Sequence, residues 1–336
     1  MENNRPINYK LSIVAPVFNE GSYIKNFVSE IIEVLDKLEI TQNSEIILVN
    51  DGSTDETEKH LDTLTETYPG LVYAIHLARN FGQASAITAG LHYSSGDCMI
   101  IMDSDGQDDP KCFSEFIELW KKGYDVVFAK RANRKEGVLF RFCSWLFYRL
   151  LSISAQISLP IDAGNYALID KRVIEAIKLC PERNRYIPGL RSWVGFKQTG
   201  LVVERRARYD LKPRVGFRGL WTLAMNAFFS FSYVPLFFFR FAGVVSLLLC
   251  FALILFALYH KLITGLAVTA WASQLISISF FGGINLIGIA LLGEYIARIY
   301  DEVKQRPLYI CARTSGLQKG NKSKINSPND GNHDKI

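Results

Sequence analysis

The sequence predicts an α/β domain with a mainly parallel sheet, followed by a hairpin of two transmembrane helices. Over the first hundred-odd residues, apolar runs alternate with helix-like windows, a pattern typical of parallel strands that are covered on both faces. Two later stretches, 241–259 and 262–293, contain no charged residue. Each can cross roughly 30 Å of hydrocarbon, which takes about 20 helical residues. Buried helices of a large soluble core are the alternative, but such helices seldom stay uncharged for so long.

The expected strands are short β-branched or apolar runs. They are Leu11–Val17, Glu45–Asp51, Leu71–Leu77, Cys98–Asp103 and Asp125–Ala129. Helix-like windows lie between them at about 22–38, 55–67, 82–93 and 111–122, with plausible N-caps at Ser22 and at Thr54 or Asp55. Sheets of this kind bind ligands beyond the carboxyl ends of their strands, and Asp51 and Asp103 fall at those ends.

A soluble domain, 1–215, is expected to lead through a juxtamembrane segment, 216–240, into a membrane region, 241–295, whose helices span about 237–259 and 268–293. Cationic residues flank this hairpin at both ends. They are Lys212, Arg214, Arg218 and Arg240 before it, and Arg298, Lys304, Arg306 and Arg313 after it. Because the connecting turn offers only His260 and Lys261, the positive-inside rule predicts that both chain ends lie in the cytoplasm. The polar start MENNRPINYK has no signal-peptide pattern, so we expect a multi-pass protein of the cytoplasmic (inner) membrane with domain 1–215 in the cytoplasm.

Two further segments have a distinctive composition. Residues 138–153 combine aromatic and aliphatic side chains with a narrow polar stripe that contains Arg141, which favours a helix lying in the membrane interface over an ordinary core-facing amphipathic helix. The basic tail, 296–336, has few apolar residues after Cys311 and is expected to be largely disordered.

The composition also excludes several classes of protein. Six cysteines without a C-x-x-C pair suit a reducing compartment and argue against a zinc site or a disulfide framework. The net charge of +5 lies mostly near the predicted membrane region and in the tail, so acidic lipid headgroups explain it better than nucleic acid does.

The acidic stretch MDSDGQDDP, residues 102–110, follows the fourth expected strand. A turn there can aim Asp103 and Asp105 at one hard cation, with Gln107 as a neutral oxygen ligand. Mg²⁺ and similar cations usually take one or two protein carboxylates and complete their shell with phosphate oxygens and water. The pair therefore suggests a site for Mg²⁺ or Mn²⁺ with a diphosphate, although D-x-D alone is equally typical of a solvated acidic loop. Asp108 and Asp109, before Pro110, are expected to cap the next helix.

Two other stretches end expected strands with polar residues. In VNDGSTDE (residues 49–56), Asp51 can accept hydrogen bonds from a nucleobase or ribose and Gly52 permits a sharp turn, although a turn alone would explain both. In APVFNE (residues 15–20), Pro16 and Phe18 can flank a base and Glu20 can bind its polar edge. The sequence contains neither a P-loop nor a dinucleotide fingerprint after a strand.

These motifs, with LARNFGQASAITAGL (77–91) between them and IDAGNYALIDKRV (161–173) after them, resemble family 2 glycosyltransferases with the GT-A fold. The resemblance covers about residues 10–310 and is strongest to polyprenyl-phosphate glycosyltransferases, namely bactoprenol (undecaprenyl-phosphate) glucosyltransferases and dolichol-phosphate mannose synthases. It implies a metal site at Asp103, Asp105 and Gln107. The residues that it implies for nucleotide-sugar binding are Pro16, Phe18, Glu20, Val49, Asp51, Asp103, Ser104, Arg131, Arg208 and Arg214.

One stretch departs from the family pattern. Members usually carry R-x-x-G-x-S-K-Y in a loop that closes over the donor phosphates, whereas this chain has RYDLKPRV, residues 208–215. Arg208 and Arg214 keep the two cations, but Leu211, Pro213 and Val215 replace the glycine, serine and tyrosine. Phosphate contacts can survive, while proline and the missing glycine put the hinge of the loop in doubt.

The resemblance implies inverting, metal-dependent transfer of a hexose, with UDP-glucose as the expected donor and undecaprenyl or another polyprenyl phosphate as the acceptor. Asp162 and Asp105 are the catalytic candidates, Asp162 as the group that orients the acceptor or takes its residual proton; the alternative for Asp162 is a loop acid that caps a helix-like segment after it. Arg134 and Arg141 are candidates for the lipid phosphate, or are snorkelling surface arginines.

Several alternatives remain open for the function. The donor could instead be GDP-mannose, with dolichol phosphate as acceptor, or a deoxyamino-arabinose nucleotide. A processive polysaccharide synthase would carry Q-x-x-R-W, which RSWVGFKQ (191–198) does not match. A non-enzymatic membrane scaffold with a degenerate nucleotide fold would not be expected to retain the acidic and arginine residues together. Association of protomers into a homo-oligomer is also possible.

Overall fold

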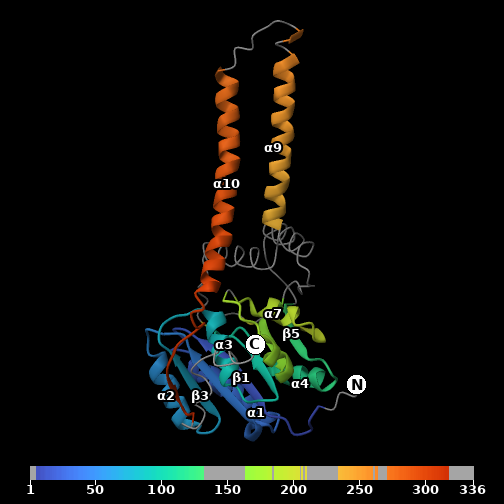
Figure 1. Ribbon diagram of the computed structural model, residues 1–336. Coiled ribbons are helices and arrows are strands. Elements are labelled where there is room, and N and C mark those ends of the chain that lie inside the picture. The colour runs from blue at the N-terminus through green and yellow to red at the C-terminus, as the bar shows by residue number, and fades with distance from the viewer. Residues whose placement is uncertain are drawn as a thin grey trace, which may run out of the picture. The chain divides into compact units, whose positions relative to one another are not determined.

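The computed structural model describes residues 5–131, 163–183, 185–204, 206, 209, 234–259, 262–263 and 271–317. The chain divides into two compact units. One comprises Met1–Phe140, Ile157–Gly216 and Arg306–Ile336, and contains the sheet; the other comprises Arg141–Gln156 and Phe217–Gln305, and contains two long helices. Figure 1 labels several elements of each unit.

Within its described residues, the first unit is built on one sheet of eight strands. The strands are β1 (Leu11–Val17), β2 (Ser44–Asn50), β3 (Val72–Leu77), β4 (Cys98–Ile101), β5 (Val126–Arg131), β6 (Ala163–Asp170), β7 (Gln198–Val203) and β8 (Cys311–Ser315). Their order is β7-β5-β6-β4-β1-β2-β3-β8. The pairs β4–β1, β1–β2, β2–β3 and β5–β7 are parallel, whereas β6 runs antiparallel to both neighbours and β8 runs antiparallel to β3. The predicted mainly parallel α/β sheet is therefore confirmed.

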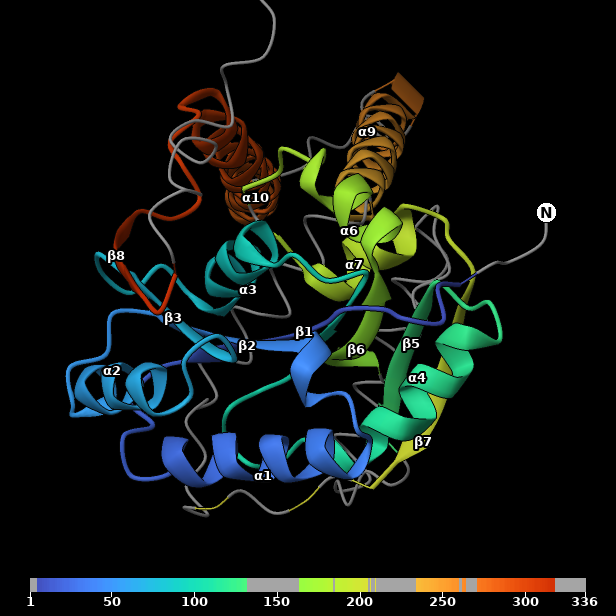
Figure 2. The same cartoon turned by 90° about the horizontal axis from the view of Figure 1, so that it is seen from below.

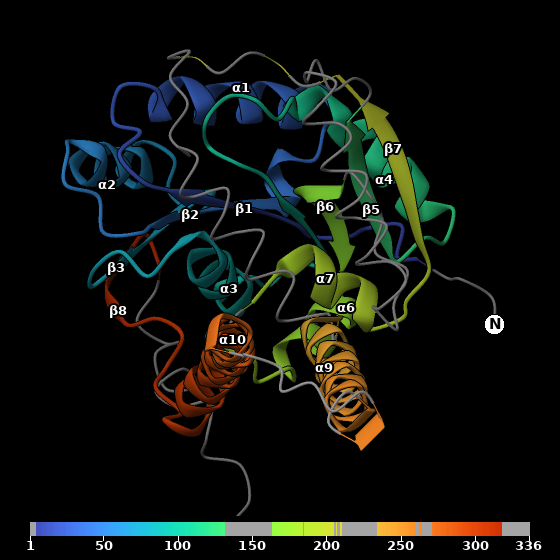
Figure 3. The ribbon, with the colours of Figure 1, turned by 90° about the horizontal axis from the view of Figure 1, so that it is seen from above.

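Helices cover both faces of the sheet. They are α1 (Ile24–Lys37), α2 (Thr57–Thr67), α3 (Gln83–Tyr93), α4 (Phe113–Lys121), α6 (Lys171–Lys178) and α7 (Ile187–Trp193), with short 3-10 turns η1 (Thr41–Asn43) and η2 (Pro110–Cys112). Figures 2 and 3 show α1, α2 and α4 on one face and α3, α6 and α7 on the other. Strands that are buried on both faces need apolar side chains in both directions, which explains the unbroken run LSIVAPV in β1.

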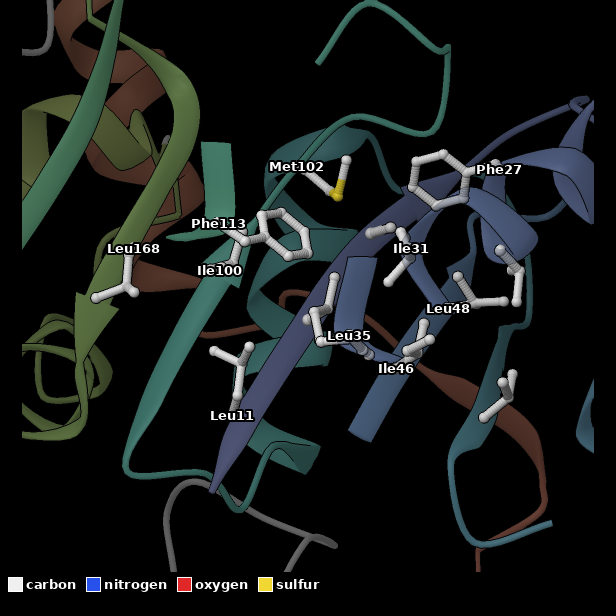
Figure 4. Close-up of a cluster of buried hydrophobic side chains, with 14 of the residues drawn as sticks. Leu11, Phe27, Ile31, Leu35, Ile46, Leu48, Ile100, Met102, Phe113 and Leu168 are labelled. Carbon is white, nitrogen blue, oxygen red and sulfur yellow. The ribbon is translucent and has the colours of Figure 1, made fainter. Parts of the chain in front are cut away.

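Each face has its own hydrophobic core. On α1 the apolar residues Ile24, Phe27, Val28, Ile31 and Leu35 recur at helical spacing and are all buried. They pack with side chains of β1, β2, β4 and α4, some of which Figure 4 labels, such as Leu11, Leu48 and Phe113. On the opposite face, α3 lies so close to β1 that a Cβ atom on Gly90 would come within 2.3 Å of Val14 Cγ1. These contacts hold helices against both faces of the central strands.

Two strands lie in stretches where the sequence did not indicate a strand. The segment after Asp162 is not helix-like, because Ala163–Asp170 forms β6 and α6 begins only at Lys171. Residues 311–315, assigned to a largely disordered tail, form β8 on the edge of the sheet, where the Arg313 guanidinium bonds to the carboxylates of Glu58 and Asp62. These ion pairs explain the order of a strand that has little apolar surface of its own.

The second unit contains α9 (Val234–Tyr259) and α10 (Trp271–Val303), which run side by side (Figure 1). Phe239 of α9 packs over Gly288 of α10. By length and composition both helices can cross a membrane, through Phe239–Phe256 with mean hydropathy 2.4 and Ser277–Val303 with mean hydropathy 1.6. Two long apolar helices therefore lie where the hairpin was expected, and α10 continues beyond residue 293. The predicted interfacial helix, 138–153, lies outside the described residues.

Candidate active site

The loops after β1, β2 and β4 meet at one edge of the sheet. Because these three strands are parallel neighbours, their carboxyl ends lie together, and Glu20, Asp51 and Asp103 each follow one of them. The buried hydroxyl of Ser104 donates a 2.8 Å hydrogen bond to the carbonyl of Pro16 and so ties the end of β4 to the end of β1. The edge is thus built from three separate stretches of sequence, and Glu20, Asp51 and Ser104 are buried within it.

The acidic loop after β4 is held by its own side chains. The backbone N–H of Asp103 donates to Asp108 Oδ2 at 2.9 Å, and the N–H of Gln107 donates to Asp105 Oδ1 at 3.1 Å. Gly106, with φ of 75°, allows the turn between them. The expectation that Asp108 caps the next helix was therefore wrong, since its carboxylate closes the loop.

The cap itself comes from Asp109, as expected. Its Oδ1 accepts a 3.0 Å hydrogen bond from the N–H of Lys111, and Pro110 opens the 3-10 turn η2. Asp109 and Pro110 therefore stop the acidic loop and start the helical segment that leads into α4.

The loop offers oxygen ligands that fit a hard cation. Asp103, Asp105 and Gln107 supply two carboxylates and an amide, the donor set that Mg²⁺ or Mn²⁺ takes when phosphate oxygens and water fill the rest of the shell. Among the described residues there is no group of three or more His, Cys, Asp or Glu side chains that could hold a metal by themselves.

Asp51 organises the loop that follows β3. Only 3% of this residue is exposed, and its two carboxylate oxygens accept hydrogen bonds from the N–H groups of Phe81 and Gly82 at 2.7 and 3.0 Å. Burial raises the pKa of the carboxyl, and the two hydrogen bonds oppose this shift. A Cβ atom on Gly52 would lie 2.4 Å from the carbonyl carbon of Arg79, so only glycine allows the two loops to approach this closely.

The loop after β1 makes contact with two other segments. Asn19 has a φ of 53°; its N–H donates to Ser53 Oγ and its Oδ1 accepts from the N–H of Thr54. Glu20 is buried and accepts a hydrogen bond from the hydroxyl of Tyr209. Phe18, by contrast, is 37% exposed at this edge. Asn19 was not predicted from the sequence, although asparagine adopts the left-handed conformation more readily than most residues.

A small cavity of about 30 Å³ opens beside the acidic loop. Its lining residues are Asp103, Gln107, Asp108, Ala129, Lys130, Gly164, Asn165, Tyr166 and Val203. Lys130 and Asn165 bring a cation and an amide to the same space as Asp103. Neither was predicted, because β6 was not recognised and Lys130 carries no motif.

The structure describes only two of the other predicted site residues, and one of these by its backbone alone. Val49 is buried within β2. Arg131 ends β5, and only its backbone is described. The remaining candidates lie outside the described residues. They are Arg134, Arg141, Asp162, Arg208 and Arg214.

Comparison with known proteins gives a consistent result. Residues 12–178 match the profile of the family described as "Glycosyl transferase family 2". An uncharacterized glycosyltransferase of Synechocystis is 37% identical over 92% of this chain and 96% of its own length. The prophage-derived bactoprenol glucosyl transferase of Shigella flexneri is 39% identical over 91% of this chain and 98% of its own length. A solved mannosyltransferase of Pyrobaculum calidifontis, in complex with GDP-Man and Mn²⁺, is a distant structural neighbour, with 17% identity over 65% of this chain and 61% of that chain and a TM-score of 0.46.

A mainly parallel α/β sheet with a D-x-D loop at its carboxyl edge is the architecture expected of a glycosyltransferase of the GT-A class. With relatives that match over nine-tenths of its length, the chain belongs to glycosyltransferase family 2.

Proposed function

We propose that this glycosyltransferase moves a hexose, most simply glucose from UDP-glucose, to undecaprenyl or another polyprenyl phosphate. The observation that carries the proposal is the meeting of Asp51 and the Asp103–Gln107 loop at one sheet edge, in a chain that aligns over 91% of its length with a bactoprenol glucosyl transferase. The product is a lipid-linked sugar that can serve as a donor for cell-envelope glycosylation.

The donor is proposed to bind across the carboxyl edge. Pro16, Phe18, Glu20, Val49 and Asp51 hold the nucleoside, and Asp103, Asp105 and Gln107 hold Mg²⁺ or Mn²⁺ with the diphosphate. The metal, when bound, neutralises charge that develops on the leaving diphosphate. Ser104, which is tied to Pro16, keeps the two loops in register. Arg131, Arg208 and Arg214 are assigned to the donor phosphates.

The acceptor is proposed to attack from the opposite face of the sugar. A phosphate monoester is largely dianionic near pH 7, because its second pKa is about 6. Its oxygen can therefore attack the anomeric carbon without a strong general base, and the configuration is inverted. Asp162 would orient the acceptor or take its residual proton. Arg134 and Arg141 would hold the lipid phosphate, and Asp105 would act on the leaving side with the metal.

The two long helices suit a lipid acceptor. Only 0% and 6% of the apolar windows of α9 and α10 are buried within the structure, so their side chains need lipid or another apolar partner. We further propose that α9 and α10 cross the cytoplasmic membrane, and that the cationic residues flanking them keep the glycosyltransferase unit and both chain ends in the cytoplasm. This arrangement would bring a membrane-bound polyprenyl phosphate and a soluble nucleotide sugar to the same enzyme.

The test is lipid-linked sugar formation by membranes that carry the chain. Radiolabelled UDP-glucose, GDP-mannose and other nucleotide sugars are supplied one at a time, and lipid products are extracted. We expect UDP-glucose to label the lipid, and Asp103→Ala to lower the rate at least about a hundredfold while circular dichroism stays unchanged. Asp36→Ala, at an exposed acid of α1 that bonds locally to Thr41, is the matched control. If only GDP-mannose labels the lipid, the donor is GDP-mannose and not UDP-glucose. Full activity of Asp103→Ala would refute the metal site.

A further inference from the structure

Arg206 fastens the acidic loop to α1. It follows β7, and its backbone N–H donates to the carbonyl of Gln107 at 3.1 Å. Its guanidinium forms two bonds with Asp109, with Nε 3.0 Å from Oδ2 and Nη2 2.7 Å from Oδ1. Nη1 donates to Glu30 Oε2 of α1 at 2.9 Å. A bidentate pair of this kind fixes orientation as well as distance, because the planar fork matches the carboxylate.

Tyr209 anchors the same segment a second time. Its hydroxyl donates to the buried carboxylate of Glu20, and its ring stacks on Tyr23 with centroids 4.5 Å apart and planes within 8°. The Tyr23 ring in turn covers Gly106, where a Cβ atom would lie 3.0 Å from it. The acidic loop is therefore held at Gly106, at Gln107 and at Asp109 by groups outside itself.

These contacts from outside the loop oppose the repulsion among its own carboxylates. Asp103, Asp105, Asp108 and Asp109 place four carboxylates within seven residues, and like charges at such short range repel one another. Arg206 offsets one of these charges at Asp109, beyond the proposed metal ligands. Arg206 thereby restrains the loop through Asp109, whose carboxylate is not assigned to the metal.

We propose that Arg206 is a positioning residue, which holds the Asp103–Gln107 loop in the conformation that receives the metal diphosphate. The proposal rests on the proposed function, because that assigns the metal and diphosphate to this loop. Arg206 also stands two residues before Arg208, where the segment assigned to the donor phosphates begins. It therefore links the metal loop to the start of that segment through one short stretch of chain.

The first measurement needs neither metal nor substrate. The N–H groups of Asp103 and Gln107 are hydrogen-bonded within the loop, so their hydrogen exchange reports its order. In metal-free protein, Arg206→Gln should speed exchange in peptides covering 103–109 about tenfold, the loss expected for a charge-assisted pair at a partly exposed site. Arg206→Lys keeps the charge but loses the planar guanidinium fork. Its exchange rate should lie between those of the starting protein and Arg206→Gln.

The second measurement is Mn²⁺ binding, followed by electron paramagnetic resonance with UDP present. Arg206→Gln should raise the Kd for Mn²⁺ about tenfold, while metal-free UDP binding stays within about twofold of the starting protein. In lipid labelling, the half-saturating metal concentration should rise by the same factor, with kcat at saturating metal nearly restored.

Arg313→Gln is the matched control, because Arg313 also bridges two carboxylates, those of Glu58 and Asp62, at a similar side-chain exposure of 41% against 36% for Arg206. It should leave loop exchange and Mn²⁺ affinity unchanged. If Arg206→Gln matches this control in both readouts, or if it weakens metal-free UDP binding as much as Mn²⁺ binding, the proposal is overturned. If the starting protein binds neither UDP nor Mn²⁺, the proposed function fails, and loop exchange still decides whether Arg206 orders the loop.

Discussion

Gln83 donates a 2.6 Å hydrogen bond from Nε2 to Oδ1 of Asp103, so the first residue of α3 reaches the first carboxylate of the acidic loop. This bond orients the carboxylate, as groups that support metal ligands commonly do. We predict that Gln83→Ala lowers kcat/KM for the donor about tenfold, the usual effect of losing a hydrogen bond to a charged group. Steady-state lipid labelling at a fixed metal concentration measures it.

Gln83→Glu tests the same hydrogen bond more strictly than Gln83→Ala does. It keeps the length of the side chain but replaces the donor with a carboxylate, which would repel Asp103, and the loss should exceed that of Gln83→Ala. Equal activity of both variants and the starting protein would show that Asp103 is oriented without Gln83.

The strands were predictable where burial leaves a local signature. β1 was predicted at its observed bounds because a parallel strand buried on both faces must be apolar throughout. β6 begins with Ala-Gly-Asn, residues with low strand propensity, and lies antiparallel between two strands that are distant in sequence. β8 reads CARTS, and its order depends on pairing with Asp62 about 250 residues earlier. The sequence around β6 and β8 contains no signal for the distant segments with which these strands pair.

At the site too, residues with a local sequence signal were predictable and residues brought in by tertiary contacts were not. Asp51 and Asp103 could be predicted, because each stands directly after an apolar run and the ends of neighbouring parallel strands meet. Gln83, Lys130 and Arg206 reach the acidic loop from α3, β5 and the segment after β7, so only tertiary structure brings them there. The roles of Asp108 and Asp109 also differ in a way that sequence spacing could not resolve.

Gly90 is predicted to tolerate no side chain. Alanine is favoured over glycine in a helix by about 1 kcal/mol. Here, however, the added methyl group would lie 2.3 Å from Val14 Cγ1 and 3.2 Å from Val49 Cγ2, and overpacking of this kind costs about 1–3 kcal/mol. Gly90→Ala should therefore lower the free energy of unfolding by up to about 2 kcal/mol, measured by chemical denaturation.

A double variant separates this clash from any other cause. Val14→Ala removes the methyl group that a side chain at position 90 would strike, so Gly90→Ala combined with Val14→Ala should cost less than the sum of the two single changes. Additive costs would show that the strain arises elsewhere on α3.

Arg313 is predicted to stabilise the edge of the sheet. Its hydrogen bond lowers the pKa of Asp62 to about 2. Since the ionised carboxylate is favoured in the folded state, this stabilisation is complete above the unfolded pKa of Asp and is lost as pH falls through the folded value. With both side chains more than a third exposed, Arg313→Gln should lower the free energy of unfolding by only about 1 kcal/mol at neutral pH. The difference should disappear between about pH 4 and pH 2; a difference that persists there would place the effect outside the ion pair.

His92 is predicted to make the structure sensitive to mild acid. Burial lowers its pKa to about 4, with Lys178 and Arg185 adding repulsion, and its Nδ1 lies 2.9 Å from the hydroxyl of Tyr309 just before β8. The unfolded state, with a histidine pKa of about 6.5, binds more protons than the folded state across this interval, so stability falls as pH drops from about 6.5 to 4, by up to about 3 kcal/mol. Because burial also lowers the pKa of His76, the decisive quantity is the difference in unfolding free energy between the starting protein and His92→Gln at each pH. Glutamine keeps an acceptor for Tyr309 and does not titrate, so its relative stability should rise steadily below about pH 6.5. A pH-independent difference would mean that His92 titrates alike in both states and that its burial does not set this response.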